Sequence, residues 1–283
     1  MNNTFELTIP KIVDKKILGE LGDTKIVQIK IFSPIIAQHY QPGQFVIIMV
    51  EEHGERIPLT ITEADISLGT ITLIFQEVGY TTKLLGKLDI GDNLYHIVGP
   101  LGKPTEIKYY GNIVFVGGGV GTAEIYPVAV AMKEKNNKII TIIGARNKNL
   151  VILEDKFKEL SDKLYITTDD GSYGIKGLVT DVLKGLLGKE KIDLVYAVGP
   201  VVMMKAVSYL TKDYNIPTIV SLNTIMIDGT GMCGSCRITY DGKIKYVCCD
   251  GPEFDGHKVD WDEVLKRSKT YIEQEQRILS LNT

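Results

Sequence analysis

The most restrictive feature of this 283-residue chain is a group of acidic and sulfur-bearing residues near its C-terminal end. Asp228, Cys233, Cys236 and Cys248 are separated by four, two and eleven residues. A plant-type 2Fe-2S site has the spacing Cys-x4-Cys-x2-Cys with a distant fourth cysteine. Here a carboxylate, which is also an anionic ligand, stands in the place of the first thiolate. The spacing therefore predicts a 2Fe-2S cluster on these four residues, in a loop whose glycines let the backbone wrap around a metal.

Two other interpretations of the cysteines remain open. A Cys-x2-Cys pair with a later cysteine is also typical of zinc sites, in which Asp228 or His257 would be the fourth ligand. The cysteines could also be unrelated buried thiols, although all four fall between residues 233 and 249. Cys249 is the surplus cysteine beside Cys248. If this segment is extended, neighbouring side chains point apart and only one of the pair faces the metal.

Composition limits the class of protein. Hydrophobic and charged contents of 44% and 24% are ordinary for a globular chain of two domains. A net charge of −3 gives no general attraction to nucleic acid or anionic membranes, and no apolar run reaches the roughly 20 residues of a membrane helix. The N-terminus lacks an apolar signal-peptide core. Clustered cysteines in such a chain indicate metal ligation in a reducing cytoplasm, so we expect a cytoplasmic protein without nucleic-acid or membrane partners.

The first hundred residues have the pattern of a small antiparallel β-barrel. Short runs rich in Ile, Val, Thr and Phe are separated by turn residues, with one helix expected at Thr81–Leu88. The predicted strands are Phe5–Val13, Lys25–Phe32, Phe45–Val50, Ile57–Thr62, Thr70–Glu77 and Asn93–Val98.

After Gly99–Gly102 the pattern changes to alternating strands and helices. The strands are continuous apolar runs, as expected for a parallel sheet covered on both faces, so we predict a doubly wound α/β nucleotide-binding domain. The predicted strands are Asn112–Val116, Lys138–Ile143, Leu164–Thr168, Leu194–Val198 and Thr218–Leu222. The predicted helices are Thr122–Lys135, Glu154–Leu160, Leu178–Leu187 and Val201–Tyr214.

These patterns divide the chain into four regions. Residues 1–103 form the barrel domain, residues 104–222 the α/β domain, residues 223–260 the cluster-binding loop region, and residues 261–283 one C-terminal amphipathic helix.

Three strand ends of the α/β domain carry residues suited to a nucleotide. Gly117–Ala123 follows a strand and opens a helix, where glycines admit a pyrophosphate to the free N–H groups of the helix start. A tight turn without a ligand is the alternative. Thr168–Gly174 and Val198–Met203 also follow parallel strands, although Gly199-Pro200 is equally suited to a plain turn into a helix.

The motifs, in this order, resemble the ferredoxin–NADP reductase superfamily along nearly the whole chain, which implies a flavin-binding barrel joined to a nicotinamide-binding domain. A cluster loop after the nucleotide domain resembles two families within it. They are the electron transfer subunits of dihydroorotate dehydrogenase and the small subunits of NADH-dependent reduced ferredoxin:NADP oxidoreductase, also called sulfide dehydrogenase. Asp228 in place of a first cysteine, and the segment Cys248–Asp255, resemble the second family. The resemblance also selects Cys248, two residues before Asp250-Gly251-Pro252, as the last ligand.

The resemblance implies the residues that hold each cofactor. FAD would be held by Arg56, Pro58, Leu59, Thr60, Gln76, Val78, Gly79, Thr81 and Thr82. NAD(H) would be held by Gly118, Gly119, Val120, Gly121, Thr122, Asp169, Asp170, Gly171, Gly199, Pro200 and Met203. The cofactors would supply the hydride-transfer chemistry, so no catalytic side chain is expected. Arg146 and Lys148 leave the choice between NAD and NADP partly open.

The implied function is electron transfer between NAD(H), FAD and the 2Fe-2S cluster, to or from a larger partner subunit with flavin and 4Fe-4S clusters, in an electron-bifurcating oxidoreductase. One alternative is the electron transfer subunit of an NAD-dependent dihydroorotate dehydrogenase. A zinc-stabilised nucleotide-binding regulator is the alternative without redox chemistry.

Overall fold

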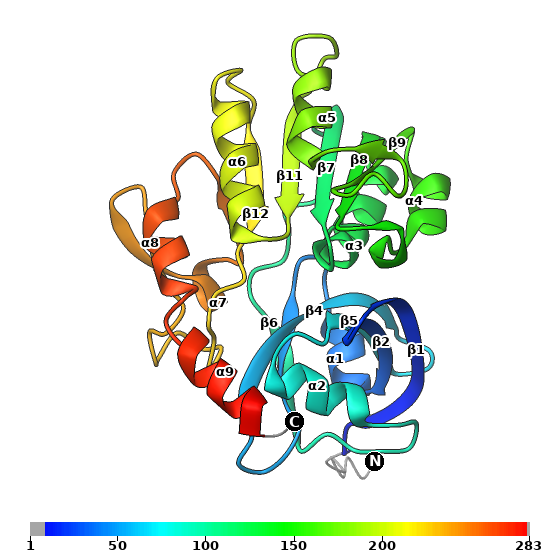
Figure 1. Ribbon diagram of the computed structural model, residues 1–283, viewed down its shortest axis with the longest axis vertical. Coiled ribbons are helices and arrows are strands. Elements are labelled where there is room, and N and C mark those ends of the chain that lie inside the picture. Colours follow the sequence, from blue (N-terminus) through cyan, green and yellow to red (C-terminus); the bar gives the residue numbers. More distant parts are fainter. Residues whose placement is uncertain (1–8, 282–283) are drawn as a thin grey trace, which may run out of the picture.

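The structure is a computed structural model that describes residues 9–281. It contains a β-barrel, an α/β domain and a cluster-binding region that lies beside both (Figure 1). None of the helices within these residues is long and apolar enough to cross a bilayer.

The barrel is one antiparallel sheet of six strands. Hydrogen bonds from the amides of Ile12 and Leu94 to the carbonyls of Asp92 and Pro10 join its two edges. The buried faces of the strands form an aliphatic core around Ile29, Ile61 and Leu73. In spatial order the strands are β1 (Lys11–Leu21), β2 (Thr24–Phe32), β5 (Thr70–Gln76), β4 (Arg56–Asp65), β3 (Phe45–Met49) and β6 (His96–Leu101), with helices α1 (Pro34–His39) and α2 (Tyr80–Lys87).

The α/β domain is built on a seven-stranded sheet. The strand order reverses between β7 and β11, as expected of a doubly wound fold. In spatial order the strands are β10 (Ile175–Lys176), β9 (Lys163–Thr168), β8 (Lys138–Ala145), β7 (Asn112–Gly118), β11 (Leu194–Val198), β12 (Thr218–Ser221) and β15 (Glu253–Asp255).

Helices cover both faces of this sheet. Alternate residues of β7 point to opposite faces, with Phe115 packed beside α3 and α4 and Val116 beside α5 and α6. The helices are α3 (Gly121–Glu134), the 3-10 turn η1 (Lys148–Leu150), α4 (Glu154–Leu160), α5 (Val179–Leu186) and α6 (Val201–Lys212).

The cluster-binding region leaves the sheet after β12 and returns to it at β15, which pairs antiparallel with β12. Between these strands lie the hairpin β13 (Arg237–Tyr240) and β14 (Lys243–Tyr246) and the short helix α7 (Val247–Asp250). Cys236, Ile238 and Val247 belong to the same hydrophobic core as the α/β domain. The region is therefore an integral part of that domain's packing.

The predicted fold is confirmed, with differences at several elements. The first strand was predicted at Phe5–Val13, of which residues 5–8 lie outside the described part; β1 occupies Lys11–Leu21. The strand predicted at Asn93–Val98 begins later, as β6 at His96, because residues 91–94 close the barrel against residues 10–12. The sequence did not indicate the short edge strands β10 and β15, which depend on long-range pairing.

The prediction of one C-terminal helix is wrong. The segment forms two helices, α8 (Trp261–Arg267) and α9 (Ile272–Leu281). Between them lie Ser268 and Thr270, whose hydroxyls donate to the carbonyls of Leu265 and Arg267, a bonding pattern that weakens a helix.

The start of α3 packs closely against the end of β11 because Gly121 has no side chain. A Cβ at Gly121 would overlap the carbonyl oxygen of Val198, whereas a Cβ at Gly185, inside α5, would meet nothing within 4 Å. We expect Gly121→Ala to lower the free energy of unfolding by about 1–3 kcal/mol, because the helix must move away from the strand. The matched control Gly185→Ala should leave it unchanged or raise it by about 0.5–1 kcal/mol. Urea unfolding measures both, and equal effects would contradict this account.

Candidate functional site

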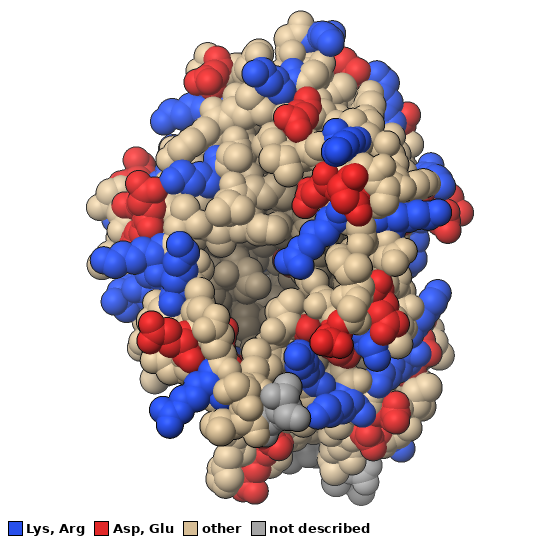
Figure 2. Space-filling model, viewed as in Figure 1, with Lys and Arg blue, Asp and Glu red and all other residues tan. Residues whose placement is uncertain are grey.

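Three cavities lie where the barrel, the α/β domain and the cluster-binding region meet. Figure 2 shows a hollow in the middle of this face, whose visible wall is mostly uncharged. The first cavity, of about 450 Å³, lies between β4 and the starts of α2 and α3. It brings together eight of the nine residues predicted to hold FAD, namely Pro58, Leu59, Thr60, Gln76, Val78, Gly79, Thr81 and Thr82.

The polar groups at the start of α2 are partly engaged with each other. The Thr82 hydroxyl accepts hydrogen bonds from the amides of Val78 (3.1 Å) and Gly79 (2.9 Å). The Thr81 hydroxyl donates to Glu55 (2.7 Å). These bonds fix the turn that borders the cavity, so Thr82 has a structural role besides its predicted contact with a pyrophosphate.

Arg56, the ninth predicted residue, lines a third cavity of about 450 Å³ together with Arg237 and Arg267. This cavity shares Glu55, Ile57, Pro58, Asn223 and Met226 with the first, so one extended ligand can occupy both. Its wall also includes Thr224, whose buried hydroxyl has no hydrogen-bond partner within the described residues. Arginines and an unpartnered hydroxyl suit the phosphates and polar edges of a dinucleotide, and the donor set therefore fits FAD.

The second cavity, of about 640 Å³, opens at the carboxyl ends of β7 and β11, where the strand order reverses. Only glycine fits at two positions of its floor, because a Cβ at Gly118 or Gly199 would collide with Met203. The start of α3 borders it, where the helix dipole favours a nucleotide phosphate, although the amides of Gly119, Thr122 and Ala123 already donate to backbone carbonyls. It brings together Gly118, Gly119, Val120, Gly121, Asp169, Gly199, Pro200 and Met203 of the predicted NAD(H) residues.

Three of the residues predicted to hold NAD(H) do not line the second cavity. Thr122 is fully buried beneath the turn, and its hydroxyl has no partner within the described residues. Asp170 and Gly171 form an exposed turn in which the Asp170 carboxylate accepts the Ser172 amide, and this bonding to Ser172 lowers the pKa of Asp170. The assignments of these residues to the nucleotide remain predictions.

The first and second cavities share a wall that the sequence did not reveal. Gln76, Val120, Glu124, Ser221 and Asn223 line both. The Thr60 hydroxyl donates to Glu124 Oε2 at 3.0 Å, which joins β4 of the barrel to α3 of the α/β domain. Burial raises the pKa of Glu124 to about 7, although the bond from Thr60 opposes this. The only signal in the sequence was an acidic residue in an otherwise apolar helix start.

The cysteine region holds two thiols ready to share a metal. The sulfurs of Cys236 and Cys248 lie 3.3 Å apart, and neither forms a disulfide. Metal–sulfur bonds of about 2.3 Å at tetrahedral angles place two thiolates about 3.8 Å apart, so this pair fits one metal with a small adjustment. Burial, together with the Cys236 thiol, raises the pKa of Cys248, and a bound cation reverses that preference by deprotonating its ligands.

Cys249 lies closer to this pair than expected. The premise of an extended segment was wrong, because residues Val247–Asp250 form helix α7. The Cys249 sulfur lies 3.6 Å from that of Cys248, but Cys249 is exposed whereas Cys248 is buried. The difference in burial agrees with Cys248 as the predicted ligand.

Asp228 organises the loop in front of the two buried thiols. Its carboxylate accepts the amides of Thr230 (2.8 Å) and Cys233 (2.7 Å), and these bonds lower its pKa. Burial alone would raise the pKa of Cys233, but the hydrogen bond with the Ser235 hydroxyl (3.0 Å) lowers it. Both groups therefore favour the anionic forms that bind metal. The four predicted ligands do not all point to one place. In residues 9–281, no group of three or more acidic, Cys or His side chains is arranged around a single ion.

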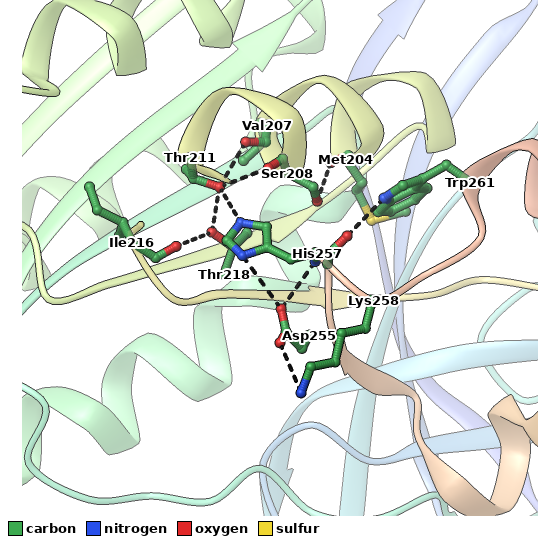
Figure 3. Close-up of polar contacts among 11 residues, drawn as sticks. Met204, Val207, Ser208, Thr211, Ile216, Thr218, Asp255, His257, Lys258 and Trp261 are labelled. Atoms are coloured by element: carbon green, nitrogen blue, oxygen red, sulfur yellow. Dashed lines mark hydrogen bonds and ion pairs between the residues drawn. The ribbon is translucent and has the colours of Figure 1, made fainter. Parts of the chain in front are cut away.

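His257 lies away from the cysteines. Figure 3 shows its ring between α6 and β15, where Nε2 is 3.0 Å from the Thr211 hydroxyl and Nδ1 is 3.8 Å from Asp255. The neighbouring Trp261 indole donates to the Gly256 carbonyl at 2.9 Å. His257 is thus part of the packing that fixes β15 to α6, which removes it as the fourth ligand of a zinc site.

A buried polar cluster connects the cluster-binding region to the α/β domain. Glu253 on β15 accepts hydrogen bonds from the hydroxyls of Tyr196 on β11 (2.5 Å) and of Thr105. Burial raises the pKa of Glu253 and also that of Tyr196. This cluster holds the return of the cluster-binding region against the sheet and the linker after the barrel.

Comparison with known proteins identifies the family. Residues 223–260 match the family described as the iron–sulfur cluster binding domain of dihydroorotate dehydrogenase B, and residues 115–209 match the oxidoreductase NAD-binding domain. A Thermotoga maritima protein described as a homolog of the dihydroorotate dehydrogenase B (NAD(+)) electron transfer subunit is 50% identical over 87% of each chain. This chain belongs to the dihydroorotate dehydrogenase B electron transfer subunit family.

Other members and a solved structure are also similar. A probable electron transfer subunit from Methanocaldococcus jannaschii is 35% identical over 78% of this chain and 81% of the relative. A chain in the structure of an NADH-dependent reduced ferredoxin-NADP oxidoreductase, reported for its insights into flavin-based electron bifurcation, is 46% identical. It superposes with a TM-score of 0.89 over 96% of this chain and 97% of its own length. Ferredoxin-NADP+ reductase from Plasmodium falciparum, at 15% identity and a TM-score of 0.56, shares the fold alone.

These findings confirm the predicted oxidoreductase class and the resemblance to both families. They also confirm the predicted set of FAD, a 2Fe-2S cluster and NAD(H). As a member of an electron transfer subunit family, the chain works with a larger catalytic partner.

The arrangement of the sulfurs predicts which cysteines the cluster needs. We expect Cys236→Ser and Cys248→Ser to remove iron and acid-labile sulfide, because each takes away one of the two buried ligands. Cys249→Ser should retain both, together with the visible absorption of the cluster. Metal and sulfide analysis of the purified variants measures this. Loss of iron only in Cys249→Ser would contradict the assignment of Cys248.

Proposed function

We propose that this chain passes electrons between NAD(H), FAD and its 2Fe-2S cluster, to or from a larger subunit that contains flavin and 4Fe-4S clusters, in a bifurcating NADH-dependent ferredoxin:NADP oxidoreductase. The observation that carries this proposal is the continuity of the three cavities. The second shares residues with the first, and the first with the third, which Ser235 and Arg237 of the cysteine region border. A nicotinamide, a flavin and the cluster thus have neighbouring places in one protein.

Each part of the chain has a distinct task in this proposal. The start of α3 and the Gly118–Gly199 floor bind and orient the nicotinamide, while Thr60 and the aliphatic Pro58 and Leu59 position the flavin ring. When bound, the flavin takes two electrons with a hydride from the nicotinamide and can release them singly to a one-electron carrier. The buried Cys236 and Cys248 shield the cluster from water, and the exposed Cys233 faces the outside. We also propose a cytoplasmic location, since free thiols persist in a reducing compartment.

A role in dihydroorotate oxidation is the second candidate. The match of residues 223–260 to the dihydroorotate dehydrogenase B family favours it. The carboxylate of Asp228, in the place of a first cysteine, favours the bifurcating oxidoreductase. The partner that copurifies from the native host separates the two: a large flavin and iron–sulfur subunit supports the first, and a dihydroorotate-oxidising subunit supports the second. A protein that contains zinc and lacks flavin absorbance would support the regulator instead.

The nucleotide preference gives a direct test of the second cavity. We expect NADH to reduce the bound flavin at least about tenfold faster than NADPH. Arg146 is the only basic residue among those that line this cavity, so a 2′-phosphate would meet little compensating charge. Stopped-flow absorbance under anaerobic conditions measures the two rates. Faster reduction by NADPH would overturn the assignment to NAD.

The exposed apolar side chains around the cysteine loop suit the proposed partner subunit. Met232 is 88% exposed, and Ile227 and Ile244 are 50% and 64% exposed. Electrons must leave through this face, because it carries the exposed Cys233.

We therefore expect Met232→Glu to weaken binding of the large subunit about tenfold or more, while iron content stays unchanged. Ile66→Glu, at a turn of the barrel where Ile66 is 70% exposed, is the matched control and should have no effect on binding. Titration of the purified large subunit by calorimetry measures the affinity. Equal weakening by both variants would contradict this docking face.

A further inference from the structure

Glu124 borders both the predicted flavin cavity and the predicted nicotinamide cavity. Five residues line both the first and the second cavity, and Glu124 is the one titratable side chain among them. It lies in the first turn of α3, between the predicted places of the flavin and the nicotinamide. A carboxyl group at this position experiences any change of charge on either cofactor.

The surroundings of Glu124 leave its charge uncompensated. Its carboxyl accepts one hydrogen bond, from the Thr60 hydroxyl on β4, and no cation of residues 9–281 pairs with it. The other shared lining residues are Gln76 from β5, Ser221 from β12, Val120 and Asn223, all uncharged. The titratable group facing it from β11 is Tyr196, whose hydroxyl is bonded to Glu253 of β15. Arg146 also lines the second cavity, and Glu55 and Glu275 line the first, but burial and the hydrogen bond from Thr60 are what act on the pKa of Glu124.

Desolvation by this environment raises the pKa of Glu124 to about 7, so the carboxyl is poised between its two forms at neutral pH. A negative charge nearby would raise this pKa further, since a like charge disfavours the ionised carboxylate. Reduction supplies such a charge. A hydride brings two electrons and one proton to the flavin, which therefore gains one negative charge.

We propose that Glu124 is a redox-linked proton acceptor: it binds one proton from solvent when the flavin is reduced and releases it when the electrons leave. This proposal rests on the proposed function, because it requires FAD in the first cavity. In reduction, NADH gives a hydride to FAD, and the Glu124 carboxylate gains a solvent proton as an O–H bond. In reoxidation, two electrons pass singly to the cluster, the flavin releases its one proton, and the Glu124 O–H bond breaks to release the other. Two electrons and two protons are thus accounted for in each direction.

The pH dependence of the flavin midpoint potential tests this in the holoprotein. For a two-electron couple each linked proton contributes about 30 mV per pH unit. Wild-type protein should show about 60 mV per pH unit from about pH 7 upwards, until the carboxyl of the reduced state titrates. In the same interval Glu124→Gln should show about 30 mV per pH unit, because the amide cannot bind the second proton. Glu134→Gln, the same change at the exposed end of α3, should behave as wild type.

A second variant protects the test against misfolding. Thr60→Val keeps the Glu124 carboxyl but removes the hydrogen bond that favours its ionised form. The pH interval in which the midpoint potential changes by about 60 mV per pH unit should therefore move to higher pH. An unchanged slope in a flavin-containing Glu124→Gln protein overturns the proposal. If Glu124→Gln does not fold, Thr60→Val provides the test. A pH interval of steep slope at the same place as in the wild type then overturns the proposal. Wild-type protein without flavin absorbance would refute the proposed function itself, which separates the two failures.

Discussion

The packing of the first turn of α3 against β4 is the contact on which the arrangement of the three regions depends. It brings the nucleotide-binding turn of one domain against the predicted flavin strand of the other, and the bond between Thr60 and Glu124 lies at this contact. Because the carboxyl ends of β7 and β11 open beside the same turn, two cavities become neighbours without a tunnel between them. An enzyme that moves electrons over short distances needs such direct adjacency.

The cysteine region extends from the β12–β15 edge of the same sheet. The pairing of β15 with β12, the Glu253–Tyr196 bond and the burial of Trp261 hold it without a flexible linker. Rigid attachment matters because a loop that moved would change the separation between the cluster and the flavin. The exposed thiol of Cys233 then lies at the surface while the paired thiols remain inside.

The sequence was sufficient wherever function depends on local chemistry. The Gly117–Ala123 turn and the Cys233-x2-Cys236 spacing each lie within one short segment, so their roles could be argued from neighbouring residues. Glu124 could not be found in this way, because its importance arises only when β4 packs against α3. The position of Cys249 depended on α7 being helical, a turn that the bond from the Gly251 amide to the Val247 carbonyl closes. The break between α8 and α9 was within reach, since Ser268 and Thr270 supply competing hydroxyls, but a run of charged residues concealed it.

The paired positions of Ser221 and Glu253 have an evolutionary consequence. The chain departs from the sheet and rejoins it at two facing residues, so a plain hairpin turn could join β12 to β15 in the same register. Loss of the metal-carrying segment would nevertheless expose core that Cys236, Ile238 and Val247 now cover, so a descendant that discarded it would need apolar replacements there.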